Sequence, residues 1–167
     1  FVLLRELGRG AMGLVFEARQ CSLDRHVALK VLPLEFNDDR DAVLRFHREA
    51  SAAGRLRHPA IVSVYQVGVS GGTHFYAMEL VQGHSLSALV KRQGALALER
   101  AVEIIRDAAW GLHHAHERGV VHRDIKPANI LRRGEMFKIA DLGIAFAASE
   151  EGGSVHLLPV VLNSQWI

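Results

Sequence analysis

The chain of 167 residues lacks several features that would mark a particular class of protein. Cys21 is its single cysteine, so no disulfide can form within the chain, and a reducing compartment is the expected environment. No apolar run approaches the roughly 18 residues that cross a bilayer, and the amino terminus has no signal-peptide pattern. These absences predict a soluble, cytoplasmic polypeptide and leave open a membrane anchor in a longer parent protein.

The chain also has no large excess of positive or negative charge. The formal net charge is +2, because 20 lysines and arginines are set against 18 acidic residues. This near balance gives little support for a nucleic-acid partner. The composition is that of a globular protein, 49% hydrophobic and 23% charged, and the length predicts one domain.

The most informative segment brings a carboxylate, a lysine and an amide together within His122–Asn129, and a second carboxylate, Asp141, follows it. The apolar stretches Ile130–Leu131 and Phe137–Ala140 flank the turn Arg132–Glu135 and predict a hairpin. The polar residues should therefore lie on loops at the ends of a rigid element. This set of groups can position a hydroxyl, a phosphoryl group and a divalent metal.

Three glycines near the amino terminus, Gly8, Gly10 and Gly13, form a second motif. Their spacing alone is weak evidence, because dinucleotide-binding folds share it. Here an alternating, strand-like stretch follows the glycines, whereas a flavin- or NAD-binding unit requires an apolar helix. Lys30 comes next, inside an apolar run, and a buried lysine needs a phosphate or a carboxylate as partner.

In this order, the glycine loop, the strand lysine and the two carboxylate motifs resemble those of eukaryotic-like (bacterial-type) serine/threonine protein kinases. The resemblance covers about residues 1–148 and implies an incomplete α+β, protein-kinase-like fold. Residues 1–80 would form the small lobe, an antiparallel sheet with one helix, and residues 81–148 the first part of a helical lobe. We expect residues 149–167 to be an activation-segment remnant or an irregular tail, because no Ala-Pro-Glu motif follows.

Hydrophobic periodicity predicts the elements of both lobes. The five expected strands span Phe1–Leu7, Leu14–Arg19, His26–Leu32, Ile61–Gly68 and His74–Leu80. One helix is expected over Asp38–Leu56 with Asn37 or Asp38 as its cap, a second from Ser85 to about Gln93, and a third over Ala97–Arg118. The apolar stripe of the third helix comprises Leu98, Ala101, Val102, Ile105, Ala108, Ala109, Leu112 and Ala115. Part of it should lie exposed where helices of a complete kinase would cover it, which predicts poor solubility or association.

The resemblance implies ATP and Mg²⁺ as cofactors and gives roles to the matching residues. Gly8, Gly10 and Gly13 would let the backbone approach the phosphates. Lys30 would bind the α- and β-phosphates while paired with Glu49, a better candidate than Glu35 or Asp41. The residues implied around the adenine, in the two lobes and in the connector Glu79–Gly83, are Val15, Ala28, Met78, Glu79, Val81 and Leu131.

The same resemblance assigns the chemistry to the second motif. Asp124 would accept or orient the proton of the substrate hydroxyl, and Lys126 would neutralise charge on the transferred γ-phosphoryl group. Asn129 and Asp141 would hold magnesium. The Asp-x-Lys-Pro-x-Asn spacing is similar to that of the serine/threonine class, so the implied partner is a protein with a serine or threonine.

His122 and Arg123 directly precede Asp124, and a cluster of three histidines lies in the third expected helix. His122 is interpreted as a packed structural residue rather than a base, and Arg123 as a partner for a phosphorylated activation segment. His113 and His116 share a helical face, but no cysteine or carboxylate completes an obvious metal set, so a packed or solvated face is favoured.

The sequence is compatible with two functions. The first is a serine/threonine protein kinase that transfers the γ-phosphoryl group of ATP to a protein hydroxyl. The alternative is a catalytically silent, truncated kinase that acts as a nucleotide- or protein-binding module. The complete set of catalytic residue types favours the first for a longer parent. Truncation favours the second for this chain alone, which we expect to bind nucleotide weakly and to phosphorylate peptides inefficiently.

Overall fold

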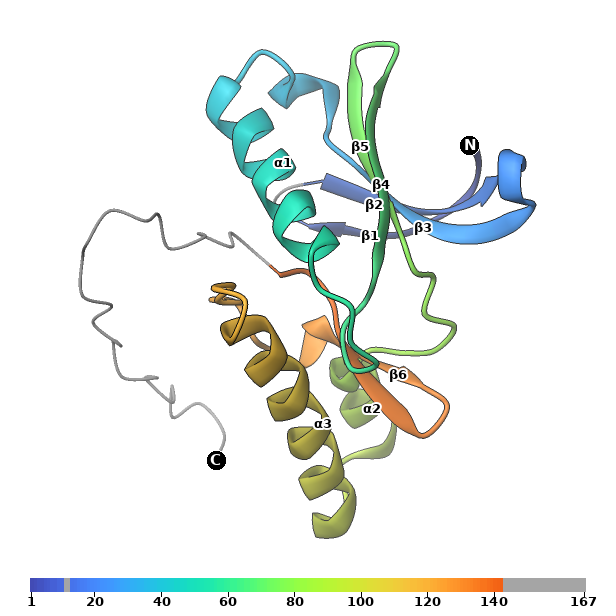
Figure 1. The fold of residues 1–167 in the computed structure, drawn as a ribbon. Helices are drawn as coiled ribbons and strands as arrows, with labels where there is room; N and C mark the ends of the chain where they lie inside the picture. The colour runs from blue at the N-terminus through green and yellow to red at the C-terminus, as the bar shows by residue number, and fades with distance from the viewer. Residues whose placement is uncertain (11–12, 143–167) are drawn as a thin grey trace, which may run out of the picture.

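The computed structural model describes residues 1–10 and 13–142, and Figure 1 shows a sheet with one helix beside it, above a helical part. The sheet is antiparallel with the strand order β1-β2-β3-β5-β4. Its strands are β1 (Val2–Gly10), β2 (Gly13–Gln20), β3 (Arg25–Val31), β4 (Val64–Ser70) and β5 (Thr73–Met78). All five expected strands are present. The fourth begins at Val64 and not at Ile61, because Ile61 instead forms a parallel bridge with Ile139.

Helix α1 (Arg40–Gly54) covers one face of this sheet (Figure 1). Its buried residues include Phe46 and Ala50, and the ring of Phe46 packs on Tyr76 of β5 with the centroids 5.1 Å apart. The cap is Asp39, whose carboxylate accepts hydrogen bonds from the N–H groups of the first turn. The expected cap at Asn37 or Asp38 was wrong by one or two residues, because Asp39 is the residue with extended backbone directly before the first turn.

The second part of the molecule contains α2 (Leu86–Gln93), α3 (Leu98–His116) and the hairpin of β6 (Ile130–Arg133) and β7 (Met136–Ile139). Short 3₁₀ turns at Cys21–Leu23, Leu34–Phe36 and Pro127–Asn129 complete the described elements. The hydroxyl of Ser85 caps α2, as expected, by accepting a hydrogen bond from the N–H of Ala88. No helix in residues 1–10 and 13–142 is both long and apolar enough to cross a membrane.

The apolar residues of α3 divide between two faces. The buried face comprises Ile104, Asp107, Ala108, Gly111 and Ala115, and it packs toward β7. Leu98, Val102 and Ile105 are 74%, 56% and 67% exposed, which confirms the expectation of uncovered apolar surface. These three residues lie outside the described core, so the expectation that they share one apolar stripe with Ala108 and Ala115 was wrong.

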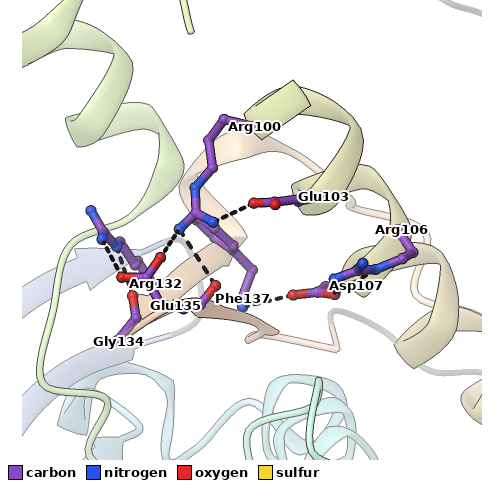
Figure 2. A network of polar contacts seen from close by, with 8 residues as sticks. All are labelled: Arg100, Glu103, Arg106, Asp107, Arg132, Gly134, Glu135 and Phe137. Carbon is purple, nitrogen blue, oxygen red and sulfur yellow. Dashed lines mark hydrogen bonds and ion pairs between the residues drawn. The ribbon is translucent and has the colours of Figure 1, made fainter. Parts of the chain in front are cut away.

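A polar network fixes the β6–β7 hairpin to α3 (Figure 2). Arg100 of α3 forms ion pairs with Glu103 and with Glu135 at the hairpin turn, and its guanidinium lies over the ring of Phe137. The buried carboxylate of Asp107 accepts a hydrogen bond from the backbone N–H of Phe137, 3.3 Å away. The hairpin that connects Asn129 to Asp141 is therefore held along its length by a long helix.

Candidate active site

The side chain of Lys30 joins three elements at the centre of the molecule. Its ammonium group on β3 lies 2.8 Å from Glu49 Oε1 on α1 and 3.0 Å from Asp141 Oδ1 after β7. The side chains of Lys30 and Glu49 are only 7% and 2% exposed. Glu35 and Asp41, the weaker candidates, do not take this place. The expected pairing of Lys30 with Glu49 is confirmed.

The protonation of this group follows from its neighbours. Burial is the largest single influence and lowers the pKa of Lys30, but the charges of Asp141 and Glu49 together outweigh it and raise the pKa above its ordinary value. Tyr76 donates its hydroxyl proton to Glu49 Oε1 at 2.7 Å. Burial first, and then the charge of Glu49, raises the pKa of Tyr76 well above its ordinary value. At neutral pH the site therefore holds a charged lysine and a neutral phenol.

Around the three glycines, strands β1 and β2 pair in antiparallel fashion, with Gly10 opposite Gly13 and Gly8 opposite Val15. At Gly13, φ is +147° and a Cβ atom would lie 2.5 Å from the carbonyl oxygen of Val31, so the fold itself requires glycine there. At Gly8 and Gly10 a Cβ atom would meet nothing within 4 Å. Packing of the described residues therefore does not explain these two glycines, whereas close approach of a ligand would.

The residues expected around an adenine ring converge on one apolar cluster. The buried members of that cluster include Ala28 and Met78, and Val15, Val81 and Leu131 pack against them from both parts of the molecule. Val15 of β2 and Leu131 of β6 therefore meet at one apolar cluster, although they belong to different parts of the molecule.

Glu79 differs from its expected surroundings. Its backbone N–H donates to the carbonyl of Ser63, and its buried carboxylate accepts from Arg133 and Lys138, each at 2.7 Å. Its backbone carbonyl lies in the connector between the two parts, where an adenine edge was expected. The side chain has a second role, as a tie between this connector and the hairpin, that the sequence did not indicate.

The residues expected to carry the chemistry, Asp124, Lys126 and Asn129, lie together at the base of the β6–β7 hairpin. Asp124 is 2.7 Å from Lys126 Nζ, and the amide nitrogen of Asn129 donates to both the carbonyl and the carboxylate of Asp124. The hydrogen bond from Lys126 is the main reason that the pKa of Asp124 lies below its ordinary value. Asp124 and Lys126 are about half exposed, so both can reach a substrate in solution.

His122 is buried beneath this loop, as expected for a structural residue. Its Nδ1 accepts from the N–H of Asp124 at 3.3 Å, and its Nε2 lies 3.2 Å from the carbonyl oxygen of Ala140. These contacts assign the neutral ring with its proton on Nε2. The ring therefore ties the backbone of Asp124 to the residue before Asp141.

Stability should depend on pH through this ring. Burial lowers the pKa of His122, and it is also the main cause of the lowered pKa of His47 and of His58. Because the unfolded chain binds protons at these rings near the ordinary pKa of about 6.5, acid favours the unfolded state. We expect the free energy of unfolding to decrease as pH falls below about 6.5. Denaturant titrations at successive pH values would measure this, and His122→Gln should reduce the slope; a pH-independent midpoint would contradict it.

The oxygens of Asn129 and Asp141 fit a hard divalent cation. Because the amide nitrogen of Asn129 donates to Asp124, its Oδ1 is the atom available to a metal. Asp141 presents its carboxylate from a left-handed backbone position, φ +50°, with the side chain 42% exposed. Leu142, the next residue, is buried and forms the expected apolar plug. The remainder of the expected activation segment lies outside the described residues.

The sequence missed one residue of this site, Tyr76. Knowledge of how β3 pairs with β5 would have identified Tyr76, because Tyr76 lies directly opposite Lys30 in that pairing. The histidines of α3 also have contacts that the sequence did not predict. His113 lies 3.5 Å from Glu117, and the ring of His114 packs on His58.

Comparison with known proteins agrees with this geometry. The family model for the protein kinase domain matches residues 1–165, and the chain therefore belongs to the protein kinase family. Curated relatives are named serine/threonine-protein kinases: PknD of Mycobacterium tuberculosis is 45% identical over 153 residues, covering 91% of this chain and 23% of the relative. PknB of Mycolicibacterium smegmatis is 42% identical over 163 residues, covering 95% of this chain and 26% of the relative. The chain thus spans about a quarter of these proteins.

A solved structure shows the same fold. The kinase domain of Mycobacterium tuberculosis PknI superposes with a TM-score of 0.73 at 35% sequence identity. The match covers 86% of this chain and 58% of that chain. The fold is therefore an incomplete protein-kinase fold, as the sequence predicted.

Proposed function

We propose that this chain supplies the nucleotide-binding and catalytic residues of a serine/threonine protein kinase, which transfers the γ-phosphoryl group of ATP to a serine or threonine hydroxyl of a protein. The observation that carries the proposal is the position of Lys30, within 3.0 Å of both Glu49 and Asp141. Three residues from separate motifs thus meet where a polyphosphate would lie. The similarity to named serine/threonine-protein kinases supports the same substrate class.

In this proposal each group of residues has a separate role in nucleotide binding. The apolar cluster around Ala28 and Met78 would enclose the adenine, and the bare backbone at Gly8 and Gly10 would let N–H groups approach the phosphates. Lys30 would hold the α- and β-phosphates, and its pairing with Glu49 would fix its direction. Preorganised charge of this kind lowers the barrier because it needs no rearrangement during the reaction.

The acceptor side lies at the hairpin base. Asp124, kept ionised by Lys126, would orient the substrate hydroxyl and accept its proton as the oxygen attacks phosphorus. Lys126 would then offset the charge on the transferred group. Asn129 and Asp141 would hold Mg²⁺, which neutralises phosphate charge when it is bound.

Label transfer from γ-labelled ATP tests the proposal. A longer kinase domain that contains these residues should phosphorylate a general protein substrate with Mg²⁺ present, and the products should be phosphoserine and phosphothreonine. The 167-residue chain, assayed beside it, should bind nucleotide and transfer the label poorly. Phosphotyrosine as the main product would contradict the proposed substrate class, and absence of transfer by the longer form would contradict the activity.

A further inference from the structure

A cleft of about 500 Å³ lies beside the connector between the two parts. Its lining comes from the start of β3, the segment after α1, β4, the connector and the β6–β7 hairpin. The residues that matter for its chemistry are Arg57, His58, Tyr65, Glu79, Arg133 and Lys138. Lys30, Asp124, Asn129 and Asp141 do not line it, and Glu79 is the residue of the candidate active site, as described above, that the cleft shares.

The cleft has an excess of positive charge. Arg57, Arg133 and Lys138 are set against one carboxylate, that of Glu79, which leaves a net charge of two positive with the histidines neutral. Arg133 and Lys138 already share the two oxygens of Glu79. Arg57 is exposed and forms no hydrogen bond or ion pair with the other described residues. The cleft therefore presents an unused guanidinium beside a partly neutralised cationic pair.

The surroundings of His58 are consistent with this excess of positive charge. Its Nδ1 accepts from the N–H of Ala60 at 3.1 Å, so the neutral ring carries its proton on Nε2. Burial, and then the positive charges of His114, Arg118 and Lys138, lower the pKa of this ring. An anion placed in the cleft would relieve the mutual repulsion of these groups.

We propose that this cleft binds a phosphomonoester dianion, presented either by a phosphorylated serine or threonine of a peptide segment or as free phosphate. A dianion matches the net charge of two positive, and a guanidinium can bind two phosphate oxygens at once. The ring of Tyr65 is 42% exposed and lies under the guanidinium of Arg25 at 4.1 Å, which adds a flat wall for a peptide.

The position of Arg133 connects this cleft to the candidate active site. Arg133 lines the cleft and also donates to Glu79, whose backbone belongs to the connector. A phosphate group that binds to Arg133 in the cleft would compete with Glu79 for the guanidinium. An effect on nucleotide affinity would rest on the proposed kinase function, whereas binding in the cleft does not.

Substitution of Arg57 tests the proposal, because this exposed side chain supports no other described contact. Binding of a short phosphoserine peptide to the 167-residue chain is measured by calorimetry, together with the same peptide unphosphorylated. Arg57→Gln should raise the Kd of the phosphopeptide about tenfold, the low end of what a charge-assisted hydrogen bond contributes. Arg40→Gln removes the same charge at the other end of α1 and should leave the Kd unchanged.

Nuclear magnetic resonance locates the binding. The ring signals of His58 should shift when the phosphopeptide is added, and Arg57→Glu should abolish the shift while thermal unfolding stays that of the parent. Equal affinity for inorganic phosphate would assign the site to the free anion and would still support the proposal. Equal binding of the unphosphorylated peptide, stronger binding of a single-stranded oligonucleotide, or unchanged binding by Arg57→Gln would overturn it. ADP binding, measured in parallel, reports separately on the proposed kinase site.

Discussion

Replacement of Lys30 by methionine is expected to reduce phosphoryl transfer by about two orders of magnitude or more. Methionine is an unbranched side chain only one atom shorter, but it removes the charge that contacts Glu49 and Asp141. The phosphates would then lose a preorganised cation that a water molecule cannot replace in the same geometry. The rate of label transfer from Mg–ATP by the longer kinase domain measures the effect.

The same substitution should also destabilise the fold. Glu49 would remain as a carboxylate that is 2% exposed, with Tyr76 as its remaining described partner. Loss of one member of a buried pair typically costs about 3–5 kcal/mol of unfolding free energy. Adding Glu49→Gln to the variant removes the uncompensated charge and should recover part of this loss without restoring activity. Parent-like turnover by Lys30→Met would contradict the assigned role of the lysine.

Asp141→Asn is expected to reduce transfer by about two orders of magnitude as well, for a different reason. Asparagine has nearly the same shape, and it tolerates the left-handed backbone position of Asp141, so the local structure should persist. It lacks the charge that a divalent cation requires. The variant should lose the Mg²⁺-dependent part of ATP binding, which a titration of nucleotide affinity against magnesium concentration measures.

A control variant on the same hairpin distinguishes the loss of a carboxylate at the site from the loss of any carboxylate nearby. Glu135→Gln removes a carboxylate whose side chain is 81% exposed at the hairpin turn, and it should leave transfer and magnesium dependence unchanged. The stability of Asp141→Asn should fall less than that of Lys30→Met, because the Asp141 side chain is partly in water. Unaltered magnesium dependence in Asp141→Asn would contradict its role as a metal ligand.

Most of the fold and the pairing of Lys30 with Glu49 could be predicted from the sequence. The strands alternate, the helices carry caps, and the motif order identifies which of several acidic residues meets Lys30. The contact of Tyr76 with Glu49 could not be predicted, because it depends on the pairing of β3 with β5. These strands are neighbours in the sheet, but α1 and β4 lie between them in the sequence. The tie from Glu79 to Lys138 joins residues that are distant in the sequence.

The buried face of α3 illustrates a second limit. Both of its faces carry apolar residues at helical spacing, so periodicity alone does not decide which one is covered. A close approach decides it: a Cβ atom at Gly111 would lie 2.9 Å from the carbonyl oxygen of Ala60, so the segment before β4 packs against that side of the helix. The face with Val102 and Ile105 is left exposed.

The bridge between Ile61 and Ile139 joins the two parts through backbone hydrogen bonds, in addition to the chain after β5. The N–H of Val62 donates to the carbonyl of Ile139 at 2.9 Å, and the N–H of Ile139 donates to the carbonyl of Ala60 at 2.8 Å. The ion pairs of Lys30 with Asp141 and of Glu79 with Lys138 cross the same junction. A shift of the sheet against the hairpin would therefore break backbone hydrogen bonds as well as these side-chain contacts. Asp141, two residues after Ile139, is thus held near Lys30 from both sides of the junction.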